Sequence, residues 1–223
     1  MKNVISMMSP RMMMIAESIE PCIKVFDTGS DHAFIPIFLI QNKLCKLAVA
    51  SDVRIGPVNV AKKNISKFNM EENISTSLCD GIENARDFDC IIVAGMGGQL
   101  ICDILDREQD IAKSAEQLVL QPMNAPEKLR KYLWDNGFSI HSENLCSEKN
   151  KVYNVICARY TGKSTEYTKT ELHASKCLIK ERHILLLEYL KPKIKRLRDM
   201  VNGGNDPELT NSKLLSEIKE LVK

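Results

Sequence analysis

Residues 25–33 read Val-Phe-Asp-Thr-Gly-Ser-Asp-His-Ala, and this stretch decides the fold. A short apolar run ends at Asp27, a turn follows at Gly29, and an apolar helical pattern starts at Ala33. A strand, a tight turn and a helix in this order form the first half of a strand–helix–strand unit. The free N–H groups of the helix face the edge of the sheet where ligands of open α/β folds bind.

The same alternation continues as far as residue 160. We expect strands at residues 23–27, 46–52, 74–79, 89–94, 117–121, 138–144 and 152–159. Amphipathic helical patterns fall at residues 10–19, 33–42, 57–69, 98–110 and 126–136. This spacing predicts an α/β fold with parallel strands, and the last two strands are too close in sequence for a parallel crossover. The expected fold class is therefore a Rossmann-like class I methyltransferase sheet with a C-terminal antiparallel strand hairpin.

The C-terminal part has a different pattern. Residues 161–170 are polar and read as a linker. One apolar helix face then runs from Ile179 to Val201, with a kink or break expected at Pro192. A turn at residues 202–207 precedes a second helix at 209–222, so we expect a small α-helical hairpin. The predicted organisation is a methyltransferase domain at 1–160 and a helical hairpin at 161–223.

Composition excludes several classes of protein. The 223 residues are 44% hydrophobic and 27% charged, as in an ordinary globular protein. No apolar run reaches the ~18–20 residues of a membrane span, and no signal peptide is recognisable. The histidines and cysteines lack ligand spacing, so we expect no metal. These features predict a cytoplasmic protein without a membrane partner. We expect it to be a monomer.

The loop after the first expected strand favours a cationic ligand. A dinucleotide fold normally has Gly-x-Gly-x-x-Gly at this point, but this loop has one glycine, followed by Ser30, Asp31 and His32. A pyrophosphate would meet a like charge at Asp31. S-adenosylmethionine (SAM) has no phosphate and carries a sulfonium and an ammonium group, which suit an acidic loop. The alternative is an ordinary strand–helix turn.

Acidic residues stand at the ends of three consecutive expected strands, namely Asp27, Asp52 and Asp80. An ionised carboxylate only accepts hydrogen bonds. Asp52 is therefore placed to accept from both ribose hydroxyls, and Asp80 from the exocyclic amine of an adenine. Each acid alone is weak evidence because Asp is a common turn residue, but three in register are more specific.

Two further segments end the fourth and fifth expected strands. Residues 92–98 read Ile-Val-Ala-Gly-Met-Gly-Gly, and residues 120–124 read Leu-Gln-Pro-Met-Asn. The glycines permit close approach of a flat ligand, and the Gln121 and Asn124 amides suit the edge of a base. Each segment has an alternative interpretation. Residues 92–98 could form a dinucleotide loop, and residues 120–124 could be a polar loop that caps the next helix.

Six segments together resemble the bacterial tRNA (adenine-22-N1)-methyltransferase family: DTGSDHAFIP, ASDVRIGP, CDGIE, VAGMGG, LQPMN and KVYNV. The chain departs from the family pattern at Phe34, Met123 and Asn154 and lacks a Phe-Gly-Pro near residues 172–178. The resemblance implies SAM-dependent methylation of adenine N1 in the D-arm region of tRNA. The cofactor positions that it implies are Asp27, Gly29, Ser30, His32, Asp52, Val53, Asp80, Gly81, Ala94 and Gly95.

Candidate residues for the tRNA follow from the chemistry of the base. Adenine N1 has a free lone pair near pH 7 and needs no general base, but its methylated product is cationic. Asp31 is our hypothesis for the carboxylate nearest the base, with a helix-capping role as the competing interpretation. The candidates for contact with the substrate are Met96, Gly97, Gln121, Pro122, Asn124, Tyr153, Lys191, Lys193, Lys195, Arg196 and Arg198.

The five basic candidates belong to a charged segment. Residues 176–198 contain eight basic and two acidic residues, whereas residues 1–160 have 18 basic and 20 acidic. A basic helix suits RNA phosphates, although a solvated helix face is the simpler alternative. Three other functions remain open: methylation of another substrate, an NAD-dependent oxidoreductase, and a non-catalytic RNA-binding module.

Overall fold

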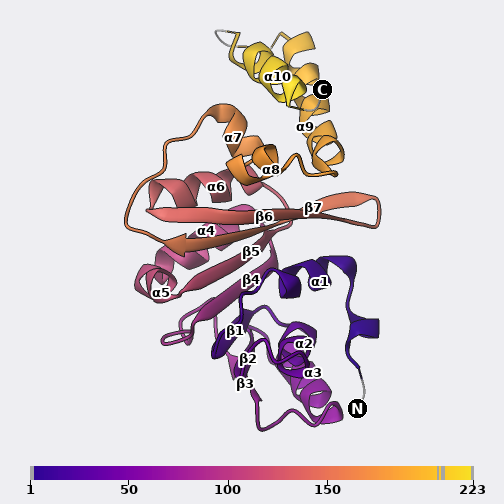
Figure 1. The fold of residues 1–223 in the computed structure, drawn as a ribbon, viewed down its shortest axis with the longest axis vertical. Coiled ribbons are helices and arrows are strands. Elements are labelled where there is room, and N and C mark those ends of the chain that lie inside the picture. Colours follow the sequence, from indigo (N-terminus) through magenta and orange to yellow (C-terminus); the bar gives the residue numbers. More distant parts are fainter. Residues whose placement is uncertain (1–2, 205, 207–208, 222–223) are drawn as a thin grey trace.

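The computed structural model describes residues 3–204, 206 and 209–221. Its centre is a seven-stranded sheet in the order β3-β2-β1-β4-β5-β7-β6 (Figure 1). Strands β1 to β5 are parallel, and β7 pairs antiparallel with both β5 and β6, which confirms the expected fold class. The strands are β1 (Lys24–Thr28), β2 (Leu47–Asp52), β3 (Ile74–Leu78), β4 (Cys90–Met96), β5 (Gln117–Pro122), β6 (Phe138–Glu148) and β7 (Lys151–Tyr160).

Helices cover both faces of the sheet (Figure 1). Side chains along a strand alternate between two cores, so Cys90 and Ile92 of β4 pack in one while Ile91 and Val93 pack in the other. Burial on both faces explains why the strands read as continuous apolar runs. The first core contains α1 (Pro10–Glu17), α2 (Phe34–Gln41) and α3 (Ile55–Lys67), and the second α4 (Gly98–Arg107), α5 (Gln109–Ser114) and α6 (Pro126–Asp135). A short 3-10 helix, η1 (Ile5–Met7), precedes α1.

Two expected segments differ from the structure. The single helix expected at 98–110 is two helices, because the backbone leaves the helical region at Glu108 (φ −114°, ψ 47°). The linker expected at 161–170 is shorter, because α7 (Lys169–His173) begins within it. Thr168 and Glu171 form a reciprocal capping box that satisfies the first N–H groups of α7 and starts this helix.

The expected C-terminal helix is also interrupted, but at a different place from the one predicted. It consists of α8 (Lys176–Glu181) and α9 (Leu186–Asn202), separated at Arg182, whose φ is 47°. Of the kink or break expected at Pro192, the break does not occur, because α9 runs through that residue. Buried Leu190 and Leu197 on either side hold the helix against its neighbours although Pro192 donates no hydrogen bond.

The last helix, α10 (Thr210–Glu220), packs on α9 and forms the expected helical hairpin (Figure 1). Leu197 of α9 joins Leu215 and Ile218 of α10 in a third core, which also takes in Leu145 of β6. The turn expected at 202–207 lies partly outside the described residues. No helix in the described ranges is long and apolar enough to cross a membrane.

Candidate active site

A cavity of about 270 Å³ opens at the carboxyl ends of β1, β4 and β5. The strand order reverses direction between β1 and β4, and open α/β sheets bind ligands at such a switch point. The lining of the cavity brings together seven of the predicted site residues: Asp27, Gly29, Ser30, Asp31, His32, Ala94 and Gly95. Gln121, predicted as a substrate residue, lines it as well.

The turn after β1 places a buried carboxylate against this cavity. Gly29 has a φ of 76°, a conformation that favours glycine, and a Cβ at this position would force Cε of Met96, 2.7 Å away, to move. The N–H groups of Gly29 and Ser30 donate to the carbonyl of Ser51, each at 2.8 Å. Asp27 is only 3% exposed and accepts a hydrogen bond from Ser30 Oγ. Burial raises the pKa of Asp27 to about 7, while the Ser30 hydrogen bond acts in the opposite direction.

Asp31 and His32 stand at the mouth of the cavity. The Asp31 carboxylate lies 3.4 Å from Nε2 of His32, and about half or more of each side chain is exposed. The His32 ring stacks on Phe34, one of the departures from the family pattern, with centroids 5.1 Å apart. The N-cap residue of α2 is Ala33, with a φ of 57° and no side-chain cap hydrogen bond. The capping interpretation of Asp31 is therefore wrong, and its carboxylate faces the site.

The predicted residues after β2 and β3 lie at the same sheet edge but do not line this cavity. Asp52 is 7% exposed and accepts from the N–H of Arg54 at 2.9 Å, while Val53 is 60% exposed. Asp80 forms an ion pair with Arg107 at 2.9 Å. Gly81, with a φ of 70°, accepts from the Thr28 hydroxyl and so ties this loop to the end of β1.

A hydrogen bond between the backbone of β4 and the Gln121 side chain joins the ends of β4 and β5. Gly95 has a φ of 75° and lies in a β-bulge, and its N–H donates to Oε1 of Gln121 at 3.2 Å. The other end of the fully buried Gln121 amide donates to the Pro122 carbonyl at 2.8 Å, so this amide shapes the pocket more than it offers free groups. A Cβ on Gly97 would lie 3.3 Å from Asn124 Oδ1. The glycine-rich segment at 92–98 lies at the end of β4, the fourth strand. A dinucleotide loop would instead lie in the first turn of the sheet, after β1.

A second, larger cavity of about 690 Å³ lies beside the first. It forms a groove between the end of β5, the β6–β7 hairpin and α9, and we call it the hairpin groove. Five predicted substrate residues line it, namely Pro122, Asn124, Tyr153, Lys191 and Lys193. Because α9 joins the groove from far along the chain, the sequence alone could not show that these residues meet.

Sequence reasoning missed Arg11, which connects the two cavities. Its side chain lines the first cavity, and its guanidinium carbon lies 5.1 Å from the centroid of the Tyr153 ring in the hairpin groove. Its Nη1 contacts the sulfur of Met123, a second departure from the family pattern. The only signal in the sequence was one cation within a Met-rich helix, which by itself indicates nothing about the site.

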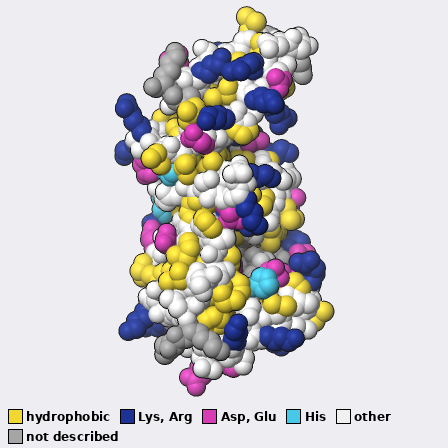
Figure 2. Space-filling model, turned by 90° about the vertical axis from the view of Figure 1, so that its right-hand side faces the viewer, with side chains coloured by type: hydrophobic (Ala, Val, Ile, Leu, Met, Phe, Trp, Pro, Cys, Tyr) yellow, Lys and Arg dark blue, Asp and Glu magenta, His cyan; other side chains and the backbone are white. Residues whose placement is uncertain are grey.

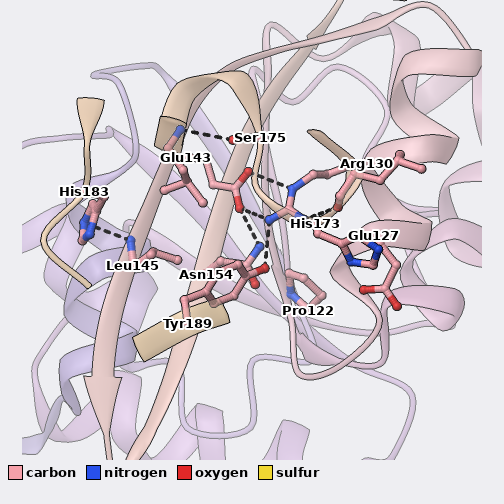
Figure 3. A network of polar contacts seen from close by, with 12 residues as sticks. Pro122, Glu127, Arg130, Glu143, Leu145, Asn154, His173, Ser175, His183 and Tyr189 are labelled. Atoms are coloured by element: carbon pink, nitrogen blue, oxygen red, sulfur yellow. Dashed lines mark hydrogen bonds and ion pairs between the residues drawn. The ribbon is translucent and has the colours of Figure 1, made fainter. Parts of the chain in front are cut away.

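A buried polar network fixes α9 beside the sheet (Figure 3). Arg130 of α6 and Glu143 of β6 form a fully buried ion pair. Arg130 also donates to the Tyr189 hydroxyl at 2.9 Å and to the Leu172 carbonyl at 2.6 Å, and Asn154 donates to Glu143 at 3.0 Å. Burial alone would lower the pKa of Arg130, but Glu143 and Tyr189 raise it, so the guanidinium stays charged. The network explains the buried Asn154, a third departure from the family pattern.

The basic residues of α9 divide into two groups. Lys193 is held inside, because its ammonium lies 2.8 Å from Glu127 of α6 and 3.2 Å from His173, and burial lowers its pKa. Burial also lowers the pKa of His173 to about 4, and the Lys193 charge adds to this shift. The others are exposed, namely Lys191, Lys195, Arg196 and Arg198. Figure 2 shows several Lys and Arg side chains on the upper part of the molecule. Within the described ranges no carboxylate pairs with Lys195, Arg196 or Arg198.

Metal binding finds no support in the described part of the chain, where no three His, Cys, Asp or Glu side chains are grouped to hold an ion. The donor set of the first cavity instead fits SAM. The buried carboxylate of Asp27, which has no cationic partner among the described residues, suits an ammonium group. Outside this cavity, at the same edge of the sheet, the carboxylate of Asp52 suits a ribose. Together with the strand order, in which β7 is inserted antiparallel between β5 and β6, the site defines a class I methyltransferase.

A family model described as tRNA (adenine(22)-N(1))-methyltransferase matches residues 25–223. The chain belongs to this family. The tRNA (adenine(22)-N(1))-methyltransferase of Bacillus subtilis is 29% identical over 227 residues, covering 97% of this chain and 95% of that protein.

Solved structures agree with this result. The structure of Streptococcus pneumoniae Sp1610 in complex with S-adenosyl-L-methionine has a TM-score of 0.86 and 27% identity, and the match covers 97% of this chain and all of that one. The crystal structure of the B. subtilis m1A22 tRNA methyltransferase TrmK has a TM-score of 0.82 and 26% identity, covering 97% and 99%. The fold similarity therefore extends over the C-terminal helices as well as the sheet.

Proposed function

We propose that this protein transfers a methyl group from SAM to N1 of the adenine at position 22 of tRNA. The observation that carries the proposal is the junction of two cavities: an acidic pocket at the switch point of the sheet opens beside the hairpin groove, which leads to the basic residues of α9. Family membership supplies the identity of the base and its position.

The residues of the first cavity suit the two ends of the cofactor. SAM supplies a methyl group on a sulfonium sulfur, ready for nucleophilic attack. Asp27 binds the ammonium group, and the left-handed turns at Gly29 and Gly95 let the backbone approach closely. Asp52 accepts from the ribose hydroxyls, and Val53, Asp80 and Gly81 contact the adenine ring, with His32, Ser30 and Ala94 completing the site.

The target adenine needs no general base, because its N1 lone pair is free near neutral pH. It does need access, since N1 is hidden in paired RNA, and flipping a base out costs a few kcal/mol. Asp31 faces the developing positive charge of the base and stabilises it. Met96, Gly97, Gln121, Pro122, Asn124 and Tyr153 shape the space around the base and orient it in line with the methyl group.

The C-terminal helices bind the tRNA outside the target nucleotide. We assign residues 1–160 to the methyltransferase domain and 161–223 to a helical hairpin that contacts phosphates through Lys191, Lys195, Arg196 and Arg198. Lys193, also a predicted substrate residue, is occupied by Glu127, which makes it the weakest of the five candidates. The protein acts as a monomer in the cytoplasm, where its substrate is found.

The test is methylation of a defined RNA. Unmodified tRNA with adenine 22 is incubated with isotope-labelled SAM, and nucleosides are analysed by mass spectrometry. We expect labelled 1-methyladenosine with this tRNA and none with the same tRNA carrying guanine 22. Label in a protein or small molecule but not in tRNA would support another methyltransferase substrate. Binding of tRNA without turnover would support an RNA-binding module, and binding of NAD in place of SAM an oxidoreductase.

A further inference from the structure

Arg11 occupies the boundary between the cofactor cavity and the hairpin groove. It lines the first cavity together with Asp27, Asp31 and Gly95. Its guanidinium stacks over the Tyr153 ring, which belongs to the groove. If a base enters the first cavity and the RNA continues along the groove toward α9, as the proposed function requires, the backbone of that nucleotide passes this boundary.

The backbone of Arg11 is fixed while its charged group has no ionic partner. Ser9 caps α1, and the N–H of Arg11 donates to Oε2 of Glu148 at 3.1 Å, which anchors the first turn of α1 to the β6–β7 hairpin. Among the described residues, the guanidinium contacts the Tyr153 ring and the Met123 sulfur and forms no ion pair. Burial alone would raise the pKa of Glu148, but the Arg11 charge is one of the groups that lower it. The cation–π contact with Tyr153 leaves the remaining N–H groups of the guanidinium available to a further acceptor.

An arginine in this place is unfavourable for the two cationic groups of the reaction. The methyl donor carries a sulfonium, and the base becomes positively charged when N1 is methylated. Neither gains from a neighbouring guanidinium. SAM also carries a carboxylate, but the guanidinium contacts Tyr153 and Met123, which line the hairpin groove rather than the cofactor cavity. The anion that a target nucleotide brings to this groove is its phosphate, and the planar fork of arginine matches phosphate oxygens in a bidentate manner.

We infer that Arg11 binds a backbone phosphate of the target nucleotide and so positions the flipped adenine over the cofactor cavity. The inference rests on the proposed function and adds to it a residue outside the family motifs quoted above. Tyr153 supports the guanidinium in this arrangement. Because the bound phosphate neutralises Arg11, RNA and cofactor favour each other's binding, and the coupling is reciprocal.

The test compares Arg11→Gln and Arg11→Lys with Arg86→Gln. Arg86 is an exposed arginine in the connection between β3 and β4, outside the site, and serves as the matched control. For each protein, KM for tRNA is measured over a range of salt concentrations, the dissociation constant of SAM is measured without RNA, and the melting temperature reports folding.

We expect Arg11→Gln to raise KM for tRNA about tenfold. The slope of log KM against log salt should fall by about one unit, the change expected for the loss of one phosphate contact. SAM binding without RNA should be unchanged or tighter, because a positive charge has been removed. Arg11→Lys should keep the salt slope and recover part of the lost affinity, and Arg86→Gln should behave as the wild type.

Three results separate the possibilities. A normal salt slope in a folded Arg11→Gln protein would overturn the inference, because a role limited to packing against Tyr153 and Met123 does not change counterion release. Loss of SAM affinity in the same variant would also overturn it, since Arg11 would then be part of the cofactor site. A wild-type protein that binds SAM and leaves tRNA unmethylated overturns the proposed function and this inference with it.

Discussion

The hydroxyl of Ser30 donates a hydrogen bond to the carboxylate of Asp27 across the turn that follows β1. Asp27 is 3% exposed, and no basic side chain of the described residues pairs with it. Burial raises its pKa to about 7, against the effect of the Ser30 hydrogen bond. Without a bound cation, the carboxyl group of Asp27 therefore titrates near neutral pH.

SAM binding should depend on this titration. Only the ionised Asp27 attracts the ammonium group, so we expect the dissociation constant of SAM to rise as pH falls below about 7, by up to tenfold per pH unit. Calorimetry at pH 5.5 to 8.5 measures it directly, with proton release on binding near pH 7. The Asp27→Asn protein should bind weakly with a flat profile, and an equally steep profile in this variant would assign the titration to another group.

Asp27 should also set the pH dependence of stability in the cofactor-free protein. Its pKa is raised from 3.8 to about 7, so the folded state binds more protons than the unfolded state between these values. Stability then falls as pH rises through this window, by about 4 kcal/mol in total. Asp27→Asn should melt like the wild type at low pH and at a higher temperature at pH 8. Equal melting temperatures at pH 8 would contradict the pKa assignment.

Asp31 should affect turnover without affecting cofactor binding. Its carboxylate is at the mouth of the cavity and caps no helix, so its loss removes charge stabilisation from the methylated base. We expect Asp31→Ala to lower kcat about tenfold or more, at the low end for such interactions because the side chain is 61% exposed. Single-turnover assays at saturating tRNA measure it, and full turnover with normal SAM affinity would refute the assignment.

Two neighbouring lysines of α9 should have different roles. Lys193 pairs with Glu127 inside the protein, whereas Lys195 is exposed. We expect Lys193→Gln to lower the melting temperature with little change in the salt dependence of tRNA binding. Lys195→Gln should leave the melting temperature unchanged and weaken tRNA binding severalfold at low salt. The opposite result, in which Lys193→Gln weakens tRNA binding and leaves the melting temperature unchanged, would show that Lys193 leaves Glu127 and binds the RNA.

The network around Arg130 should be the most sensitive structural element near the groove. Glu143→Gln removes one charge of a fully buried pair, and we expect a loss of about 3–5 kcal/mol in the free energy of unfolding. Tyr189→Phe removes a single hydrogen bond and should cost about 1 kcal/mol. Urea denaturation measures both, and similar small losses would show that the pair is solvated.

This network also limits the use of truncation. A chain that ends after Tyr160 would lose the Tyr189 hydroxyl and the Leu172 carbonyl that bind Arg130, and it would expose Leu145 of the third core. Point substitutions on the exposed face of α9 therefore test tRNA binding better than removal of the C-terminal helices.

The sequence by itself determined the features that depend on neighbouring residues. Strand runs buried on both faces, the glycine turn after Asp27 and the helical periodicity of α9 all come from local spacing, and the structure has each of them. Asp27, Asp52 and Asp80 lie at one edge of the sheet, because parallel strands bring their carboxyl ends together, while their roles in binding stay predictions. Local pattern was misleading at Pro192, where buried neighbours hold the helix together.

Only the tertiary structure decided which distant residues meet. Nothing near Arg11 in the sequence indicates Tyr153, and nothing near Lys193 indicates Glu127, yet these contacts separate a charge available to RNA from one used inside the protein. Ion pairs and stacked rings are short-range interactions between side chains. Their partners are chosen by the packing of whole helices and strands, which no local sequence pattern specifies.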